Sequence, residues 1–166
     1  KLHVVGAGVM GGDIAAVAAM SGLNVSLTDV DSSAIEGAIK RSVDLFARRL
    51  KVDEKIAAAT ARLKADPEGN DAANADLIIE AVAEKLSVKQ AVFSDLEKII
   101  KPEAILATNT SAIPLEDISI ALKDPSRLIG LHFFNPVPVL PLVEVIWSPP
   151  SKQDLSSPCP QSRSIQ

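Results

Sequence analysis

The sequence contains one cysteine, no tyrosine and only two histidines among its 166 residues. A single cysteine, Cys159, excludes a disulfide bond within the chain, and the cysteine and histidines show none of the spacings that bind zinc. No apolar run reaches the roughly 18 residues that a membrane-spanning helix needs. The formal net charge of −4 argues against a nucleic-acid partner or an anionic membrane surface. We therefore predict no metal site, no nucleic acid and no membrane span.

The most informative pattern that is present is Gly6-Ala7-Gly8-Val9-Met10-Gly11, which follows a strand-like apolar run and opens a helix-like segment. In that setting the first glycine allows a tight turn, the second lets the backbone approach a pyrophosphate, and the third lets the helix pack closely. Asp29 ends the next apolar run, where a carboxylate binds the adenosine ribose 2′-hydroxyl and repels a 2′-phosphate. The pattern favours NAD over NADP, and the alternative is a chance glycine cluster in a turn. The predicted cofactor contacts here are Gly6, Gly8, Val9, Met10, Gly11 and Asp29.

Strand-like apolar runs alternate along the chain with segments of helical periodicity, which is typical of a parallel α/β sheet. Beyond the second strand, apolar residues at helical spacing over 35–50 and a second helix over 53–63 predict a helical hairpin. Ser33 and Glu36 have the spacing of a capping box at the start of that hairpin. The predicted fold is α/β, a Rossmann-type doubly wound and mostly parallel sheet with this hairpin inserted. The predicted strands are 2–5, 25–28, 77–82, 104–107, 128–132 and 142–146.

The last part of the sequence differs in composition from the rest. Prolines and polar residues dominate from position 148 onward, and prolines at 158 and 160 exclude an ordinary helix interior. We expect a domain over 1–147 and an irregular tail over 148–166. The chain also has no initiating methionine and opens almost directly on a strand, so we expect it to be a piece of a longer protein.

A second group of chemically useful residues lies in His132-Phe133-Phe134-Asn135-Pro136-Val137-Pro138 and the strand that follows it. His132 ends one predicted strand and Glu144 lies in the next, so the turn between them can bring the carboxylate beside the imidazole. A neutral histidine can take a proton from an alcohol near pH 7, and the glutamate would fix its tautomer. The alternative is a core histidine and a glutamate on a separate, solvated face.

Other polar residues follow strands whose carboxyl ends meet at the same edge of the sheet, where ligands bind in such folds. Ser111 and Asn135 are the groups best placed to hydrogen-bond a substrate oxygen, although turns also use such residues. Glu84 and Lys89 could reach the nicotinamide half of the cofactor, or be surface residues at a helix start. Arg41, Arg48, Arg49 and Lys51 could meet coenzyme A phosphates, but a solvated helix face is the favoured interpretation. His3, inside the first strand, is predicted to be structural.

Together these motifs resemble the NAD-binding domain of 3-hydroxyacyl-CoA dehydrogenases, over about residues 1 to 147. The resemblance rests on the glycine motif with Asp29, on Glu80-Ala81-Val82-x-Glu84, on Asn109-Thr110-Ser111, and on the His132 block followed by Leu142-Val143-Glu144-Val145. The opening is most similar to the dehydrogenase region of multifunctional fatty-acid β-oxidation proteins. Ala112 departs from the family, which usually has serine there.

The resemblance implies oxidation of an L-3-hydroxyacyl-CoA to the 3-ketoacyl-CoA with reduction of NAD. It implies that His132 is the catalytic base and Glu144 its partner. Ser111 and Asn135 would hold the reacting oxygen and the nicotinamide side, with Glu84 and Lys89 in the cofactor site. The family continues into an all-helical second domain, so we expect the tail to be a remnant of the linker and this chain to turn over weakly or not at all.

Partners and location are also implied by the resemblance. An enoyl-CoA hydratase domain would precede the chain, and the complete protein would be a homodimer. We expect a cytoplasmic protein if the source is bacterial, and a mitochondrial matrix or peroxisomal one if it is eukaryotic. Two other functions stay open: a hydroxyacid dehydrogenase that acts on a free acid, and a non-catalytic NAD-binding module.

Overall fold

The computed structural model describes residues 1–147, and the predicted tail over 148–166 lies outside the described residues. One seven-stranded sheet has the order β3-β2-β1-β4-β5-β6-β7, and every neighbouring pair is parallel except β6 and β7. The Rossmann-type, mostly parallel sheet predicted from the sequence is confirmed. The strands are β1 (Leu2–Val5), β2 (Val25–Thr28), β3 (Leu63–Ala65), β4 (Leu77–Glu80), β5 (Ile105–Thr108), β6 (Leu128–Phe133) and β7 (Val143–Trp147).

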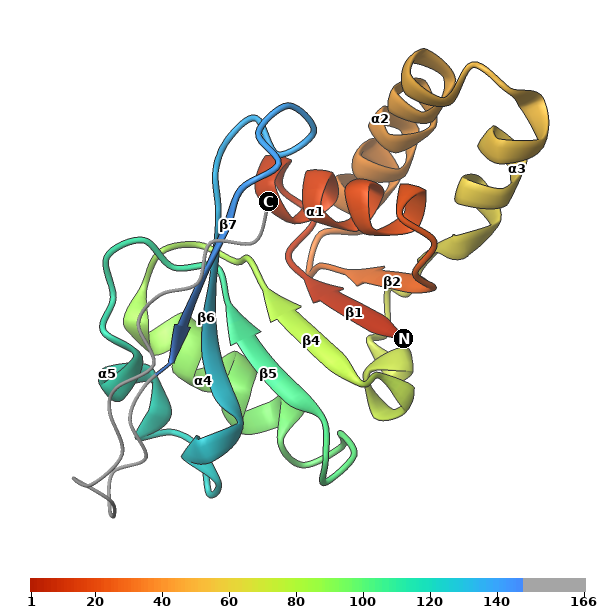
Figure 1. The fold of residues 1–166 in the computed structure, drawn as a ribbon. Helices are drawn as coiled ribbons and strands as arrows, with labels where there is room; N and C mark the ends of the chain where they lie inside the picture. The colour runs from red at the N-terminus through yellow and green to blue at the C-terminus, as the bar shows by residue number, and fades with distance from the viewer. Residues whose placement is uncertain (148–166) are drawn as a thin grey trace.

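Helices cover both faces of this sheet (Figure 1). One core cluster joins the sheet to α1 and the α2–α3 hairpin, and a second joins it to α4 and α5. Burial on both faces explains why β1 and β4 are mostly apolar, each with a single polar residue. Strand β2 instead alternates Val25 and Leu27 with Ser26 and Thr28. The helices are α1 (Val9–Met20), α2 (Ser32–Leu50), α3 (Asp53–Arg62), α4 (Leu86–Leu96) and α5 (Leu115–Ser119), with short 3-10 turns η1 (Asn70–Asn74) and η2 (Pro125–Arg127).

The helical hairpin predicted after the second strand is present, but its start differs from the prediction. The N-cap of α2 is Asp31, whose side chain accepts a hydrogen bond from the Ser33 backbone N–H at 2.9 Å. The predicted capping box is therefore wrong, because Asp31 satisfies the free N–H first. Lys51, with φ of 52°, ends α2 in the left-handed conformation and turns the chain into α3.

Two further details differ from the sequence prediction. Strand β3 is missing from it, because the strand has only three residues and a single buried side chain, Leu63. The helical spacing predicts an inner face of α4 made of Val88, Ala91, Val92, Leu96 and Ile99. Leu96 is buried, but Val88 and Ile99 are exposed, and Lys89 and Phe93 are fully buried. A lysine took the inward position because an acidic partner in the sheet compensates its charge, as the site geometry shows below.

His3 is structural, as predicted. It is 1% exposed in β1, and its Nδ1 lies 2.8 Å from the Ser26 hydroxyl of β2. Burial lowers the pKa of His3, although the carboxylates of Asp66 and Asp71 oppose that effect. The contact with Ser26 lies between two strands inside the sheet, so we assign His3 to the core.

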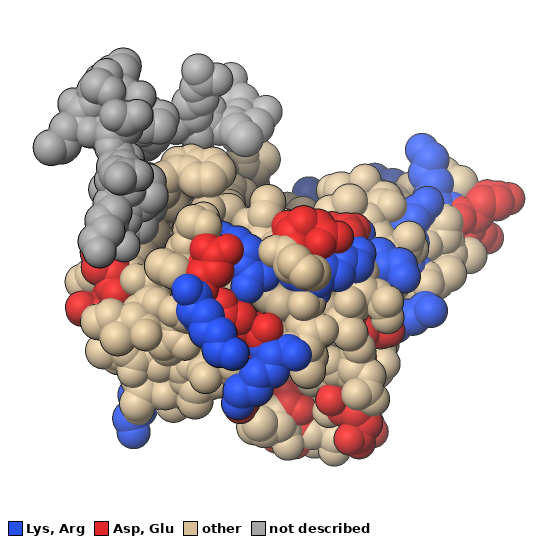
Figure 2. Space-filling model, turned by 90° about the horizontal axis from the view of Figure 1, so that it is seen from below, with Lys and Arg blue, Asp and Glu red and all other residues tan. Residues whose placement is uncertain are grey.

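The surface of the molecule mixes both signs of charge. On the face that Figure 2 shows, basic and acidic side chains are interspersed among neutral ones. Two examples of such pairing are Lys98 with Asp95 and Lys101 with Asp76, each at 2.7 Å. Within residues 1–147, none of the helices combines the length and hydrophobicity required to cross a membrane.

Candidate active site

Steric crowding requires glycine at two positions of the loop between β1 and α1, Gly6 and Gly11. Gly6 has φ of +104°, and a Cβ there would lie 2.6 Å from the Ala81 carbonyl oxygen. A Cβ on Gly11 would lie 1.8 Å from the Gly6 carbonyl oxygen. Any side chain at either position would push the helix away from the strands, so both glycines fix the tight strand–turn–helix geometry.

Gly8 is different, because a Cβ placed on it would meet nothing within 4 Å. Gly8 is also the N-cap of α1, whose first N–H groups donate no hydrogen bond to a capping side chain. The backbone at this position is thus open to a ligand, and the helix N-terminus directs N–H groups and a positive dipole toward it. The loop fits the pyrophosphate of a dinucleotide, with Val9 exposed beside it.

Asp29 lies next to this loop, at the carboxyl end of β2. One carboxylate oxygen accepts a hydrogen bond from the Ala7 N–H at 2.6 Å, and the other accepts one from the Asp31 N–H at 3.0 Å. These bonds hold the negative charge close to the glycine loop. A carboxylate in this place fits an adenosine ribose and opposes a 2′-phosphate.

His132 and Glu144 face each other across the antiparallel pair of β6 and β7. The His132 Nδ1 lies 3.1 Å from a Glu144 carboxylate oxygen. The histidine side chain is 25% exposed and the glutamate 47%, so the pair is open to a substrate on one side. The alternative interpretation, a core histidine and an unrelated glutamate, is wrong.

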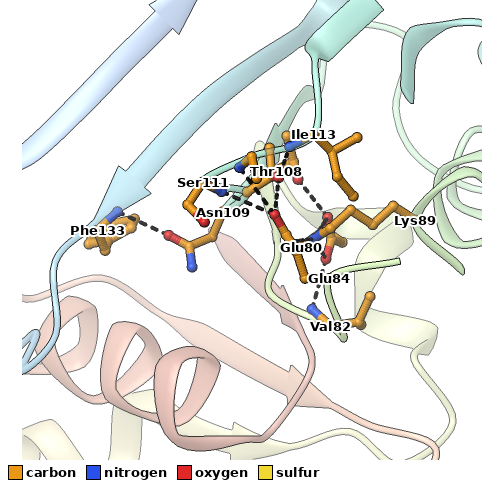
Figure 3. A network of polar contacts seen from close by, with 11 residues as sticks. Glu80, Val82, Glu84, Lys89, Thr108, Asn109, Ser111, Ile113 and Phe133 are labelled. Carbon is orange, nitrogen blue, oxygen red and sulfur yellow. Dashed lines mark hydrogen bonds and ion pairs between the residues drawn. The ribbon is translucent and has the colours of Figure 1, made fainter. Parts of the chain in front are cut away.

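Glu84 organises the turn that carries Ser111. Its carboxylate accepts hydrogen bonds from the Thr110 hydroxyl and from the Ser111 and Ala112 N–H groups (Figure 3). Burial alone would raise the pKa of Glu84, but the Thr110 hydroxyl and the Lys89 ammonium lower it below its ordinary value. A charged Glu84 therefore holds the turn closed, while the exposed Ser111 side chain stays available to a ligand.

Lys89 connects Glu84 to a second carboxylate deeper in the protein, Glu80. The Lys89 ammonium lies 2.8 Å and 3.0 Å from the two Glu80 oxygens and 3.2 Å from Glu84. Lys89 and Glu80 are both 0% exposed. Glu80 also accepts hydrogen bonds from the Thr108 hydroxyl and the Val82 N–H, so every carboxylate oxygen is satisfied (Figure 3). The interpretation of Lys89 as a surface residue is wrong.

Comparison with known proteins agrees with this geometry. Residues 1–158 match the family described as "3-hydroxyacyl-CoA dehydrogenase, NAD binding domain". The chain belongs to this family. A 3-hydroxybutyryl-CoA dehydrogenase of Mycobacterium tuberculosis is 41% identical over 151 residues, which cover 88% of this chain and 53% of that protein. The crystal structure of an Escherichia coli 3-hydroxybutyryl-CoA dehydrogenase has a TM-score of 0.84 and 40% identity, covering 87% of this chain and 32% of that one.

The family members are longer than this chain. The chain spans about half the length of the M. tuberculosis relative. It is also 40% identical over 147 residues to the alpha subunit of a fatty acid oxidation complex from Ectopseudomonas oleovorans, covering 86% of this chain and 21% of that subunit. As a member of the 3-hydroxyacyl-CoA dehydrogenase NAD-binding family, this chain carries an NAD site. The glycine loop and Asp29 are the residues predicted to form it.

The remaining predicted residues of this NAD-binding domain lie around the same edge of the sheet. Asn135 is exposed just beyond β6 and precedes a cis peptide bond to Pro136. Met10 lies at the start of α1, behind the glycine loop. The roles of Ser111, Asn135, Glu84 and Lys89 toward the cofactor stay predictions.

The arginines of the hairpin form a group with acidic neighbours. Arg41, Arg48 and Arg49 line a cleft of about 520 Å³ between α2 and residues 136–139, together with Asp13 and Asp44. Arg41 donates to the Gly8 carbonyl oxygen at 3.3 Å and Arg49 to the Pro138 carbonyl oxygen at 2.9 Å. These side chains therefore support the two loops that flank the cleft.

Sequence reasoning missed two positioning residues. Asn109 accepts a hydrogen bond from the Phe133 N–H at 2.9 Å, which ties the end of β5 to the residue after His132. Glu80, at the end of β4, anchors Lys89 of α4. A signal for Glu80 was present, because a single acidic residue interrupts an otherwise apolar strand, and a buried charge requires a partner.

Proposed function

We propose that this chain is the cofactor-binding and base-carrying part of an enzyme that oxidises an L-3-hydroxyacyl-CoA to the 3-ketoacyl-CoA. The observation that carries the proposal is the His132–Glu144 pair at the same edge of the sheet as the NAD loop. The names of the relatives, 3-hydroxybutyryl-CoA dehydrogenases and a fatty acid oxidation subunit, support it.

The roles of the residues follow from the geometry. Glu144 accepts a hydrogen bond from the Nδ1–H of His132, which leaves Nε2 free to take the proton of the 3-hydroxyl. Glu144 also stabilises the imidazolium that forms. Ser111 and Asn135 hold the reacting oxygen by hydrogen bonds. NAD, when bound, supplies the acceptor for the hydride that leaves C3.

The complete enzyme has further domains on both sides of this chain. An all-helical domain completes the substrate cleft and contributes dimer contacts, and an enoyl-CoA hydratase domain precedes the chain. The longer relatives support such an arrangement. The isolated chain then binds NAD but turns over weakly. The arginine-lined cleft offers a place for coenzyme A phosphates at the rim of the site.

The thioester of the substrate distinguishes the proposed enzyme from a dehydrogenase that acts on free hydroxyacids. With a helical domain supplied, NADH should be oxidised in the presence of acetoacetyl-CoA and not, at equal concentration, of free acetoacetate. The coenzyme A handle contributes binding energy remote from the reacting carbon, and the free acid lacks it. Equal turnover of both compounds, followed by absorbance at the NADH band, would contradict the proposal.

A further inference from the structure

A second cleft, of about 270 Å³, lies between the turn that leads into α5 and the strand pair β6–β7. The turn 110–116 forms one wall, and Gly130 of β6 with Ile146 and Trp147 of β7 forms the other. Nothing in the reaction described above uses this cleft. Ser111, however, belongs both to the cleft and to the candidate active site.

The register of the two strands places the cleft directly beside the His132–Glu144 pair. Gly130 pairs with Ile146, and His132 pairs with Glu144, so the two pairs are separated by two residues along each strand. Residues two apart in a strand point to the same face, about 7 Å from each other. A Cβ on Gly130 would lie 3.0 Å from the Ile146 Cβ, which confirms that both face the same side. The cleft therefore begins where the hydroxyl of a substrate would lie.

The chemistry of the cleft favours an uncharged hydrocarbon. Its walls include the side chains of Ile113, Leu115, Ile146 and Trp147. Among the described residues that line it, the one charged side chain is that of Glu116, which disfavours an anionic ligand. Complete ligands occupy pockets of about 300 Å³ or more, so this cleft suits a segment of a ligand.

We propose that this cleft binds the methylene chain of the acyl group beyond the reacting carbon, a proposal that rests on the proposed function. A four-carbon acyl group would barely enter the cleft, whereas a ten-carbon one would bury several methylenes between Ile146, Trp147 and the turn. Each methylene removed from water strengthens binding by up to roughly fourfold. The absence of a side chain at Gly130 keeps Ile146 seated against the strand and the cleft open. The chain therefore belongs to an enzyme that prefers medium-length acyl groups.

The test uses the tryptophan of the chain itself. Trp147 is the single tryptophan and there is no tyrosine, so near-ultraviolet-excited emission reports on the wall of this cleft. The NAD-saturated chain is titrated with decanoyl-CoA, butyryl-CoA and coenzyme A. We expect a blue shift of Trp147 emission with decanoyl-CoA and a Kd at least tenfold below that of butyryl-CoA.

A matched pair of variants locates the effect. Ile146→Asn should remove most of the tenfold difference, because it places an amide in the cleft, and leave butyryl-CoA affinity unchanged. Ile99→Asn should change neither, because Ile99 is similarly exposed (51% against 45%) but lies outside the cleft. Equal affinity for both thioesters with unchanged Trp147 emission would overturn the acyl-chain proposal while the proposed function stands. Binding of neither thioester would also overturn the acyl-chain proposal, whereas the proposed function is tested separately by turnover of acetoacetyl-CoA with the helical domain supplied.

Discussion

Replacing His132 by alanine should lower kcat for oxidation of a 3-hydroxyacyl-CoA by roughly 10²–10⁴-fold, the usual contribution of a general base. The proton of the 3-hydroxyl then loses the imidazole that accepts it. NAD affinity should not change, because the glycine loop and Asp29 lie on β1, α1 and β2. The measurement compares steady-state kinetics and NAD titrations of the chain joined to the helical domain that the proposed function requires.

Glu144→Gln is the matched variant for that experiment. It keeps the size of the side chain but removes the charge that stabilises the His132 imidazolium across 3.1 Å. We expect a smaller fall in kcat than for His132→Ala, again with unchanged NAD affinity. A His132→Ala protein that retains more than a tenth of the parent kcat would show that the base is another group. If the chain were a non-catalytic NAD-binding module, its function would likewise survive the His132→Ala substitution.

Replacing Lys89 by methionine should lower the free energy of unfolding by about 3–5 kcal/mol. The substitution preserves the apolar stem, but it leaves Glu80 as a buried charge without its cation. Glu84 also loses its ion pair and holds the Ser111 turn less firmly. Urea denaturation of the chain, monitored by circular dichroism, measures the change directly.

Lys98→Met provides the control for Lys89. Lys98 also pairs with a carboxylate at 2.7 Å, but its side chain is 62% exposed and that of Asp95 is 77% exposed. Solvent screens such a pair, so we expect a change within about 0.5 kcal/mol. If Lys89→Met and Lys98→Met destabilise the chain equally, the buried ion pair does not stabilise this domain in the way that the geometry indicates.

The centre of the sheet was predictable because its strands are mostly apolar and buried on both faces. Parallel strands in a doubly wound sheet read as continuous hydrophobic segments, and β1, β4 and β6 do so. The glycine loop was predictable for a different reason: steric crowding at Gly6 and Gly11 permits one residue type. The His132–Glu144 pair was predictable from the short antiparallel return of the chain between β6 and β7.

What sequence reasoning could not supply depends on contacts between distant segments. The inward position of Lys89 contradicts the rule that apolar residues mark the inner face of a helix, and the rule fails because Glu80 lies opposite. The bond between Asn109 and the Phe133 N–H joins strands 24 residues apart and leaves no local pattern. Strand β3 forms because β2 offers a free edge, although its own three residues carry a weak signal.

Calorimetric titration of the chain with NAD+ and NADP+ tests the central claim most directly, with Gly8→Val measured beside it. We predict NAD+ binding and an affinity for NADP+ weaker by at least about tenfold, or 1.4 kcal/mol, because Asp29 repels the 2′-phosphate. Gly8→Val should fold normally, since its Cβ meets no protein atom within 4 Å, yet lose NAD+ binding. A folded parent chain that does not bind NAD+, or a Gly8→Val chain that binds it equally well, would contradict the account.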